Sequence, residues 1–247
     1  MFPIFVPTKG RPDAALIKVL RDEGLSFYLV LEPQDKAKYL KRYPGSNFYI
    51  LPMNDGGLAY ARQCILRTAR EMGIDWYWQI DDNITGFVEV VNGKCVDASA
   101  RDALSGAEAL VGRHKRVGLI ALEYMQFAWS ATKEYQFNGR AYCTVLTSTR
   151  TGIDYSVELD AKADVDFMIK HFQKRWRSIL VKRWSMKKPP MGKNKKGGQT
   201  AMYAANRNSV VAMELKRRWP RFCNLIKKPG GIDVRIDWRY VNSLFGR

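Results

Sequence analysis

The chain has 247 residues, 46% of them hydrophobic, which is enough for a sizeable buried core in one large domain. Its formal net charge of +17 excludes an acidic protein and favours a polyanionic partner. No segment approaches the roughly 20 apolar residues of a membrane-spanning helix, and the short apolar start lacks the cleavage site of a signal peptide.

The first 80 residues alternate between short apolar runs and segments with helical spacing of their apolar residues. We predict buried strands at 2–7, 27–31, 48–51 and 76–80, and helices at 14–23, 36–42 and 58–72. This alternation at intervals of about 20–30 residues is typical of an α/β fold with an open, mostly parallel, doubly wound sheet.

The pattern changes after residue 86. Asn92-Gly93 between two apolar runs predicts a hairpin over 87–96 with a two-residue turn. Segment 185–199 is rich in Lys, Gly and Pro, and we interpret it as a mobile loop, with 185–200 as its outer bounds. We further predict helices at 103–114, 161–176 and 206–218, and strands at 117–124, 141–147, 179–184 and 234–240.

Charge is divided unevenly along the chain. The segment from Lys170 to Arg247 has 21 Lys and Arg against 3 Asp and Glu, whereas the first 169 residues have 20 against 21. We therefore predict a near-neutral core over 1–169 and a basic lobe over 170–247 that is continuous with it. Nucleic acid is favoured over a membrane surface as the partner of this lobe, because no long amphipathic apolar segment is present.

Polar side chains follow each of the four early strands. In an open parallel sheet such positions line one crevice. Adjacent carboxylates repel each other, so a cation beside them is expected, and it would also let a phosphate approach. The alternative is that these residues only cap loops and a solvated turn. The residues are Thr8, Arg11, Glu32, Asn54, Asp55, Arg62, Asp81, Asp82 and Asn83.

Four motifs carry a resemblance to a known family: IFVPTKGRP at 4–12, LVLEPQ at 29–34, LPMNDGGLAYAR at 51–62 and WQIDDN at 78–83. Together they resemble a nucleotide-sugar glycosyltransferase of the GT-A fold, and the chain is most similar to the TET-associated glycosyltransferases of bacteriophages. The resemblance covers about the first 90 residues. It implies transfer of a sugar from a UDP-sugar to a hydroxymethylated pyrimidine of DNA, such as 5-hydroxymethylcytosine, assisted by Mn²⁺ or Mg²⁺.

The resemblance also assigns roles at the donor site. Glu32 matches the acid that contacts the donor base, and Asp81 matches the first acid of a D-x-D-like motif, which faces the ribose or uracil. Asp82 and Asn83 would hold the metal, although Asn83 stands where many relatives have Asp and an amide oxygen is the weaker ligand. The other positions near the nucleotide or its phosphates are Pro7, Thr8, Arg11, Asn54 and Arg62.

A second acidic element lies at 158–166. Asp164-x-Asp166 is similar to the acid-x-Asp element that often supplies the general base in GT-A enzymes, where a carboxylate removes the proton of the acceptor hydroxyl. Between the two we slightly prefer Asp166, and an Asp base implies inversion at the sugar. The alternative is a helix start that bears acids because they complement the helix dipole. His114 and His171 are expected to be surface or hydrogen-bonded residues without a catalytic role.

The basic third interleaves cations with aromatic side chains. Lys and Arg neutralise phosphates and make binding salt-sensitive, and a Trp can stack on a displaced base, although large aromatics usually belong to the core. The lysine-rich loop either closes over the donor diphosphate or is a solvated surface loop. We predict contacts with double-stranded DNA by Arg175, Arg177, Lys182, Arg183, Lys195, Lys196, Arg217 and Arg218.

Three functions remain open from the sequence: the DNA glycosyltransferase, a glycosyltransferase with a cell-surface glycan or protein as acceptor, and a non-catalytic DNA-binding relative in which Asn83 marks decay. Nucleotidyl transfer is disfavoured because no Gly-rich phosphate-binding motif lies near the acids. The four cysteines form no C-x-x-C pair. We therefore expect free thiols in a reducing cytoplasm, that of the infected host if a phage encodes the protein.

Overall fold

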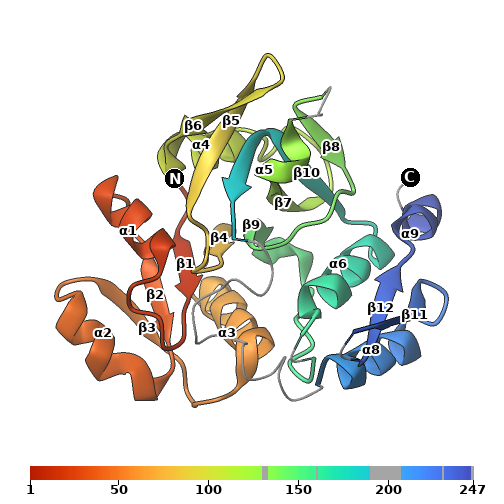
Figure 1. Ribbon diagram of the computed structural model, residues 1–247, viewed down its shortest axis with the longest axis horizontal. Coiled ribbons are helices and arrows are strands. Elements are labelled where there is room, and N and C mark those ends of the chain that lie inside the picture. The colour runs from red at the N-terminus through yellow and green to blue at the C-terminus, as the bar shows by residue number, and fades with distance from the viewer. Residues whose placement is uncertain (130–132, 160, 190–206, 230, 246–247) are drawn as a thin grey trace.

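The computed structural model describes residues 1–247 except 130–132, 160, 190–206, 230 and 246–247 (Figure 1). One large β-sheet runs through it, and a two-stranded sheet lies near the C-terminus. The strands of the large sheet are β1 (Ile4–Pro7), β2 (Tyr28–Leu31), β3 (Asn47–Ile50), β4 (Trp76–Ile80), β5 (Gly86–Val91), β6 (Lys94–Ala98), β7 (Val117–Tyr124), β8 (Tyr135–Phe137), β9 (Thr144–Ser148) and β10 (Arg177–Lys187). The small sheet pairs β11 (Cys223–Lys228) with β12 (Gly231–Ile236).

The sheet order is β3-β2-β1-β4-β9-β7-β10-β5-β6, with β8 paired to β10. Strands β3, β2, β1 and β4 are parallel, as the alternation of strands and helices predicts. Strand β9 is antiparallel to both of its neighbours, β4 and β7, and β7 is parallel to β10. The predicted α/β class is confirmed, and the carboxyl ends of the four parallel strands meet at one edge of the sheet.

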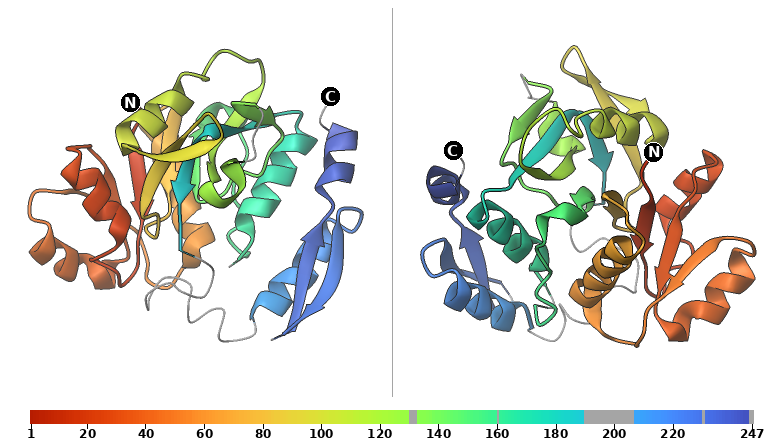
Figure 2. Two further views of the ribbon diagram at one scale, coloured as in Figure 1. Left: turned by 45° about the horizontal axis from the view of Figure 1, so that its top comes forward. Right: turned by 180° about the vertical axis from the view of Figure 1, so that it is seen from behind.

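Helices cover both faces of the large sheet because its strands are apolar on both sides (Figures 1 and 2). Val6 and Trp78 pack in one cluster with α1 (Ala15–Asp22), α2 (Lys36–Arg42) and α4 (Ala100–Glu108). Phe5 and Tyr77 point the other way, into a cluster with α3 (Gly57–Glu71) and α6 (Ala163–Gln173). The same cluster includes residues of α8 (Arg207–Arg218) and α9 (Trp238–Phe245).

Three short elements complete the described part of the chain. A four-residue helix, α5 (Met125–Ala128), follows β7, and two 3₁₀ turns are η1 (Pro33–Asp35) and η2 (Thr149–Thr151). The β5–β6 hairpin turns at Asn92 and Gly93, whose φ angles of 51° and 73° are those the Asn-Gly pair predicts. Among the described residues, no helix is both long and apolar enough to cross a bilayer.

The C-terminal part differs from the prediction in three ways. Strand β10 continues to Lys187, so 185–187 belong to the sheet, and residues 190–200 of the predicted loop lie outside the described residues. The boundary predicted after residue 169 lies within α6, and β10, which follows this helix, lies between β7 and β5 in the large sheet. The predicted strand 234–240 is wrong beyond Ile236, because α9 begins at Trp238, and β11 was not predicted.

Candidate active site

Hydrogen bonds between side chains join the tips of β1 and β4. These side chains are among those predicted to contact the sugar donor. Thr8 extends the β1–β2 pairing through a bond from its N to Val30 O, and its Oγ1 donates to Asp82 Oδ2 at 2.8 Å. Arg11 Nη1 lies 3.2 Å from Asp82 Oδ1. Asp82 is therefore bonded through both oxygens to the loop after β1, just beyond the buried Pro7 that ends this strand.

A second contact joins the tips of β1 and β2. Lys9 Nζ lies 2.9 Å from Glu32 Oε2 and also hydrogen-bonds Asp55, which follows β3. Burial lowers the pKa of Lys9, but Asp55 and Glu32 outweigh it and raise the pKa above its usual value. Asn54 is exposed and accepts a hydrogen bond from the backbone of Gln34. Lys9 was not among the predicted site residues, although it lies in the first motif.

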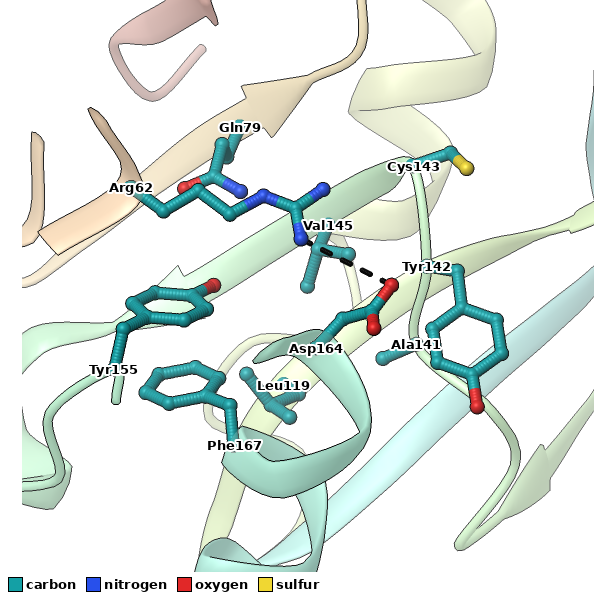
Figure 3. A pocket seen from close by; sticks show the side chains of 10 residues that line it. All are labelled: Arg62, Gln79, Leu119, Ala141, Tyr142, Cys143, Val145, Tyr155, Asp164 and Phe167. Carbon is teal, nitrogen blue, oxygen red and sulfur yellow. Dashed lines mark ion pairs between the residues drawn. The ribbon is translucent and has the colours of Figure 1, made fainter. Parts of the chain in front are cut away.

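Arg62 links the donor side of the site to the acidic element of α6. Its Nη2 lies 3.1 Å from Asp81 Oδ1. Its Nη1 lies 3.9 Å from Asp164 Oδ2, the ion pair drawn in Figure 3. Burial lowers the pKa of this guanidinium, but Asp81 and Asp164 more than compensate, so the pKa is raised and Arg62 stays charged. A narrow pocket with room for about one water molecule lies between these groups, lined also by Gln79, Tyr142 and Tyr155.

The two adjacent acids after β4 have different surroundings, and their pKa values move apart. Burial would raise the pKa of Asp81, but Lys188 and Arg62 outweigh it and hold that pKa below its usual value. Burial also raises the pKa of Asp82, and here it exceeds the opposing effects of Arg11 and Thr8. Asp81 is therefore the more strongly ionised of the two carboxylates.

Lys188 and Cys143 complete the site from the second half of the chain. Lys188 Nζ lies 3.4 Å from Asp81 Oδ2 and 2.8 Å from Cys143 Sγ. Cys143 O accepts a 2.7 Å hydrogen bond from Asp81 N, and burial raises the pKa of the Cys143 thiol to about 12. Cys143 was not predicted to belong to the site, and Lys188 lies in the lysine-rich segment 185–199, for which contact with the donor diphosphate was one of two interpretations. The only available signal was the run of lysines in which Lys188 lies.

The described residues do not fit a resident divalent cation well. Both oxygens of Asp81 already face a cationic side chain, and both oxygens of Asp82 already accept a bond from Arg11 or Thr8. Asn83 lies half-buried in the turn after β4. Among the residues that the structure describes, no group of three or more His, Cys, Asp or Glu side chains is placed to hold a metal. The predicted metal ligands Asp82 and Asn83 remain a prediction that this geometry does not favour.

The two candidate bases of α6 face different surroundings. Asp164 lines the pocket and keeps 28% of its side chain exposed. Asp166 is fully buried, accepts hydrogen bonds from Ser156 and from Trp219 Nε1, and lies 2.8 Å from Lys170 Nζ. Because both oxygens of Asp166 are occupied inside the core, the geometry favours Asp164 as the base, contrary to the slight preference from the sequence.

Neither histidine is placed for catalysis. His171 is fully buried in α6, with Nδ1 2.8 Å from Phe167 O, and burial lowers its pKa to about 4. His114 Nε2 lies 3.0 Å from the hydroxyl of Tyr135.

Those of the predicted nucleic-acid residues that the structure describes do not form one surface near the site. Arg175 and Arg177 lie at the start of β10, opposite the end that reaches Lys188, and bond the carbonyls of Leu244 and Lys115. Lys182 lies further along β10, beside an open groove next to the β5–β6 hairpin.

Several of these cations are neutralised within the protein. Arg183 pairs with Glu89 and Glu134, and Arg217 and Arg218 pair with Glu214. Lys195 and Lys196 lie outside the described residues. The tryptophans of the basic third pack against the core, namely Trp176, Trp184, Trp219 and Trp238.

A parallel sheet whose strand tips gather Arg, Lys and carboxylates beside a second acid defines a nucleotide-sugar transferase of the GT-A class. The model of the TET-Associated Glycosyltransferase family matches residues 2–198, and the chain belongs to this family. The predicted family and the predicted enzyme class are thereby confirmed. A search of curated protein sequences finds no match.

A solved structure supports the fold, and a second is reported beside it. Glucosyl-3-phosphoglycerate synthase from Mycobacterium tuberculosis, in complex with Mn²⁺, UDP and phosphoglyceric acid, is 10% identical with a TM-score of 0.55, over 96% of this chain and 86% of that one. TarS 1–349 from S. aureus, in complex with UDP, is 12% identical with a TM-score of 0.49, over 87% of this chain. This chain spans 65% of the TarS fragment.

Proposed function

We propose that the protein transfers a sugar from a UDP-sugar to the hydroxymethyl group of 5-hydroxymethylcytosine, or a similar pyrimidine, in double-stranded DNA. The observation that carries this proposal is the Arg62 bridge, with Nη2 3.1 Å from Asp81 and Nη1 3.9 Å from Asp164. It joins a cationic crevice suited to a diphosphate to a carboxylate suited to a general base. The family name and the UDP in the M. tuberculosis synthase support the choice of donor.

The chemistry follows from the positions of these groups. The Asp164 carboxylate accepts the proton of the acceptor hydroxyl, and the hydroxyl oxygen forms a bond to the anomeric carbon of the sugar. The bond from that carbon to the diphosphate breaks, and the diphosphate leaves with the electron pair. Cationic side chains aimed at the leaving group stabilise the charge that develops on it. A single displacement of this kind inverts the anomeric centre.

Two features support a nucleic-acid acceptor. The segment from Lys170 onward has 21 Lys and Arg against 3 Asp and Glu, and among them Lys227 and Arg239 are exposed. Phe127 and Trp129, which are 55% and 62% exposed, follow β7, whose last residue Tyr124 hydrogen-bonds Cys143 at the site. Exposed aromatic rings beside a site are suited to stacking on a displaced base, whereas the tryptophans of the core are not.

The test is a transfer assay on duplexes with and without 5-hydroxymethylcytosine. The protein is incubated with each duplex and with a series of UDP-sugars, in Mn²⁺ and in EDTA, and the digested nucleosides are analysed by mass spectrometry. We expect one added sugar per modified base, none on unmodified DNA, and almost none with Asp164→Asn. No gain in mass with any donor would refute the DNA acceptor. Transfer to a glycan or protein instead would identify another acceptor class.

A further inference from the structure

Lys188 follows directly on a residue whose backbone is hydrogen-bonded to the acidic turn. The carbonyl of Lys187, the preceding residue, accepts hydrogen bonds from N and Oγ1 of Thr85, at 2.9 and 3.3 Å. Thr85 ends the turn that bears Asp81 and Asp82, so β10 is tied directly to the acidic turn. The side chain of Lys188 is 19% exposed, which places its ammonium at the border between protein and crevice.

The Lys188 ammonium can leave its present hydrogen-bond partners for a ligand, because neither partner depends on it. One partner is the Cys143 thiol, whose pKa is raised by burial, so the sulfur is an uncharged and weak acceptor. The other is Asp81 Oδ2, and Asp81 keeps Arg62 at 3.1 Å on its other oxygen when Lys188 moves away. No buried carboxylate is therefore left without a cation if Lys188 turns toward a ligand.

Three carboxylates around the acidic turn are matched by three cations. Asp81, Asp82 and Asp164 face Arg62, Arg11 and Lys188, and Arg62 lies between Asp81 and Asp164 whether or not Lys188 stays in place. A divalent ion added here would have to displace one of these cations from a carboxylate oxygen. A lysine on a flexible stem instead supplies a compact charge that can turn from Asp81 to a phosphate, while Arg62 remains on Asp81.

We propose that Lys188 is the cation that binds the donor diphosphate, so that donor binding and transfer proceed without a divalent metal ion. This inference rests on the proposed function, because it concerns the donor of the same site. Lys188 Nζ leaves Asp81 and Cys143 for a diphosphate oxygen when the donor enters. It remains there as the bond to the anomeric carbon breaks and the leaving group gains its negative charge.

The experiment measures binding of UDP and of uridine to the full-length protein by isothermal titration calorimetry, in Mn²⁺ and in EDTA. The variants are Lys188→Met, Lys188→Arg and, as a matched control, Lys187→Ala. Lys187 is the adjacent lysine, but it pairs with the exposed Asp97 on the β5–β6 hairpin. Uridine lacks the diphosphate, so its binding reports whether the rest of the nucleotide site is intact.

We expect the wild type to bind UDP with an affinity that changes less than about threefold between Mn²⁺ and EDTA. Lys188→Met should bind UDP roughly 10- to 100-fold more weakly, the loss expected for one charge-assisted contact, with uridine binding unchanged. Lys188→Arg should retain most of the affinity, and Lys187→Ala all of it.

Two outcomes would contradict the inference in different ways. Binding of UDP by the wild type in Mn²⁺ but not in EDTA, or equal affinities for wild type and Lys188→Met, would overturn the role of Lys188 and leave the proposed function standing. Absence of UDP binding in both conditions would overturn the proposed UDP-sugar donor, and the inference with it.

Discussion

The two acids in the first turn of α6 offer the sharpest test of the site, because the same Asp→Asn substitution should affect activity at one position and stability at the other. Asp164→Asn removes a carboxylate that is 28% exposed beside Arg62 at 3.9 Å. Asp166→Asn removes a fully buried carboxylate that lies 2.8 Å from Lys170 and accepts from Ser156 and Trp219. The first variant should lose activity, and the second should lose stability.

The magnitudes follow from burial. Loss of a general base typically reduces turnover by about 10²- to 10⁴-fold. The free energy of unfolding of Asp164→Asn should change by less than about 1 kcal/mol, because most substitutions at partly exposed positions have small effects on stability. In Asp166→Asn an amide NH2 replaces a buried carboxylate oxygen and faces the donors of Ser156 and Lys170, and each buried donor left without an acceptor costs about 1–3 kcal/mol. Asp166→Asn should therefore unfold at a markedly lower urea concentration.

The assay combines urea denaturation followed by circular dichroism with sugar-transfer rates at saturating donor. Asp164→Asn should bind UDP and DNA as the wild type does. The assignment of Asp164 as the base is wrong if two results occur together. These are full turnover by Asp164→Asn, and loss of turnover by a folded Asp166→Asn that is as stable as the wild type. Comparable stability losses in both variants would also contradict the described difference in exposure.

Two further predictions concern stability. Burial lowers the pKa of His171 to about 4 from an unfolded value near 6.5, so the unfolded chain binds more protons between these values. The free energy of unfolding should fall as pH drops from 6.5 to 4, by up to about 3 kcal/mol, and urea titrations should show a shallower fall in His171→Gln. Gly106 in α4 has no room for a methyl group, since a Cβ would lie 2.0 Å from Trp184 Nε1. Gly106→Ala should therefore lower the melting temperature, at a cost of about 1–3 kcal/mol despite its better helix propensity, while the exposed Ser105→Ala should not.

The donor half of the fold could be predicted because its signals are local. Helix Lys36–Arg42 and strand Trp76–Ile80 have the predicted bounds, since Pro, Gly and polar residues delimit apolar runs there. The predicted strand 234–240 took in the first three residues of α9 because Trp238 and Tyr240 favour strands by propensity. Packing determines that this segment is helical, since the helix buries Val241 fully and places Trp238 edge-on to Phe172.

The site residues could be predicted only where adjacent parallel strands bring their side chains together. Thr8, Glu32 and Asp82 meet because parallel strands end at one edge. Lys188 meets Asp81 across 107 residues of sequence, through strand pairings that no local pattern encodes. Asp164 and Asp166 are two residues apart and so point about 200° apart on a helix, and sequence alone does not reveal which one faces the crevice. Likewise, nothing in the basic runs indicates that Glu89, Glu134 and Glu214 neutralise several of their cations.

The indole of Trp219 donates a hydrogen bond to Asp166. Trp219 lies beyond residue 198, where the match to the family model ends. The turn of helix that carries Asp164 is thus held in place by a C-terminal segment that lies outside the family match. Replacing this segment with another would disturb the proposed base unless the replacement brings its own indole. Shortening the chain to residues 2–198 would remove that indole as well.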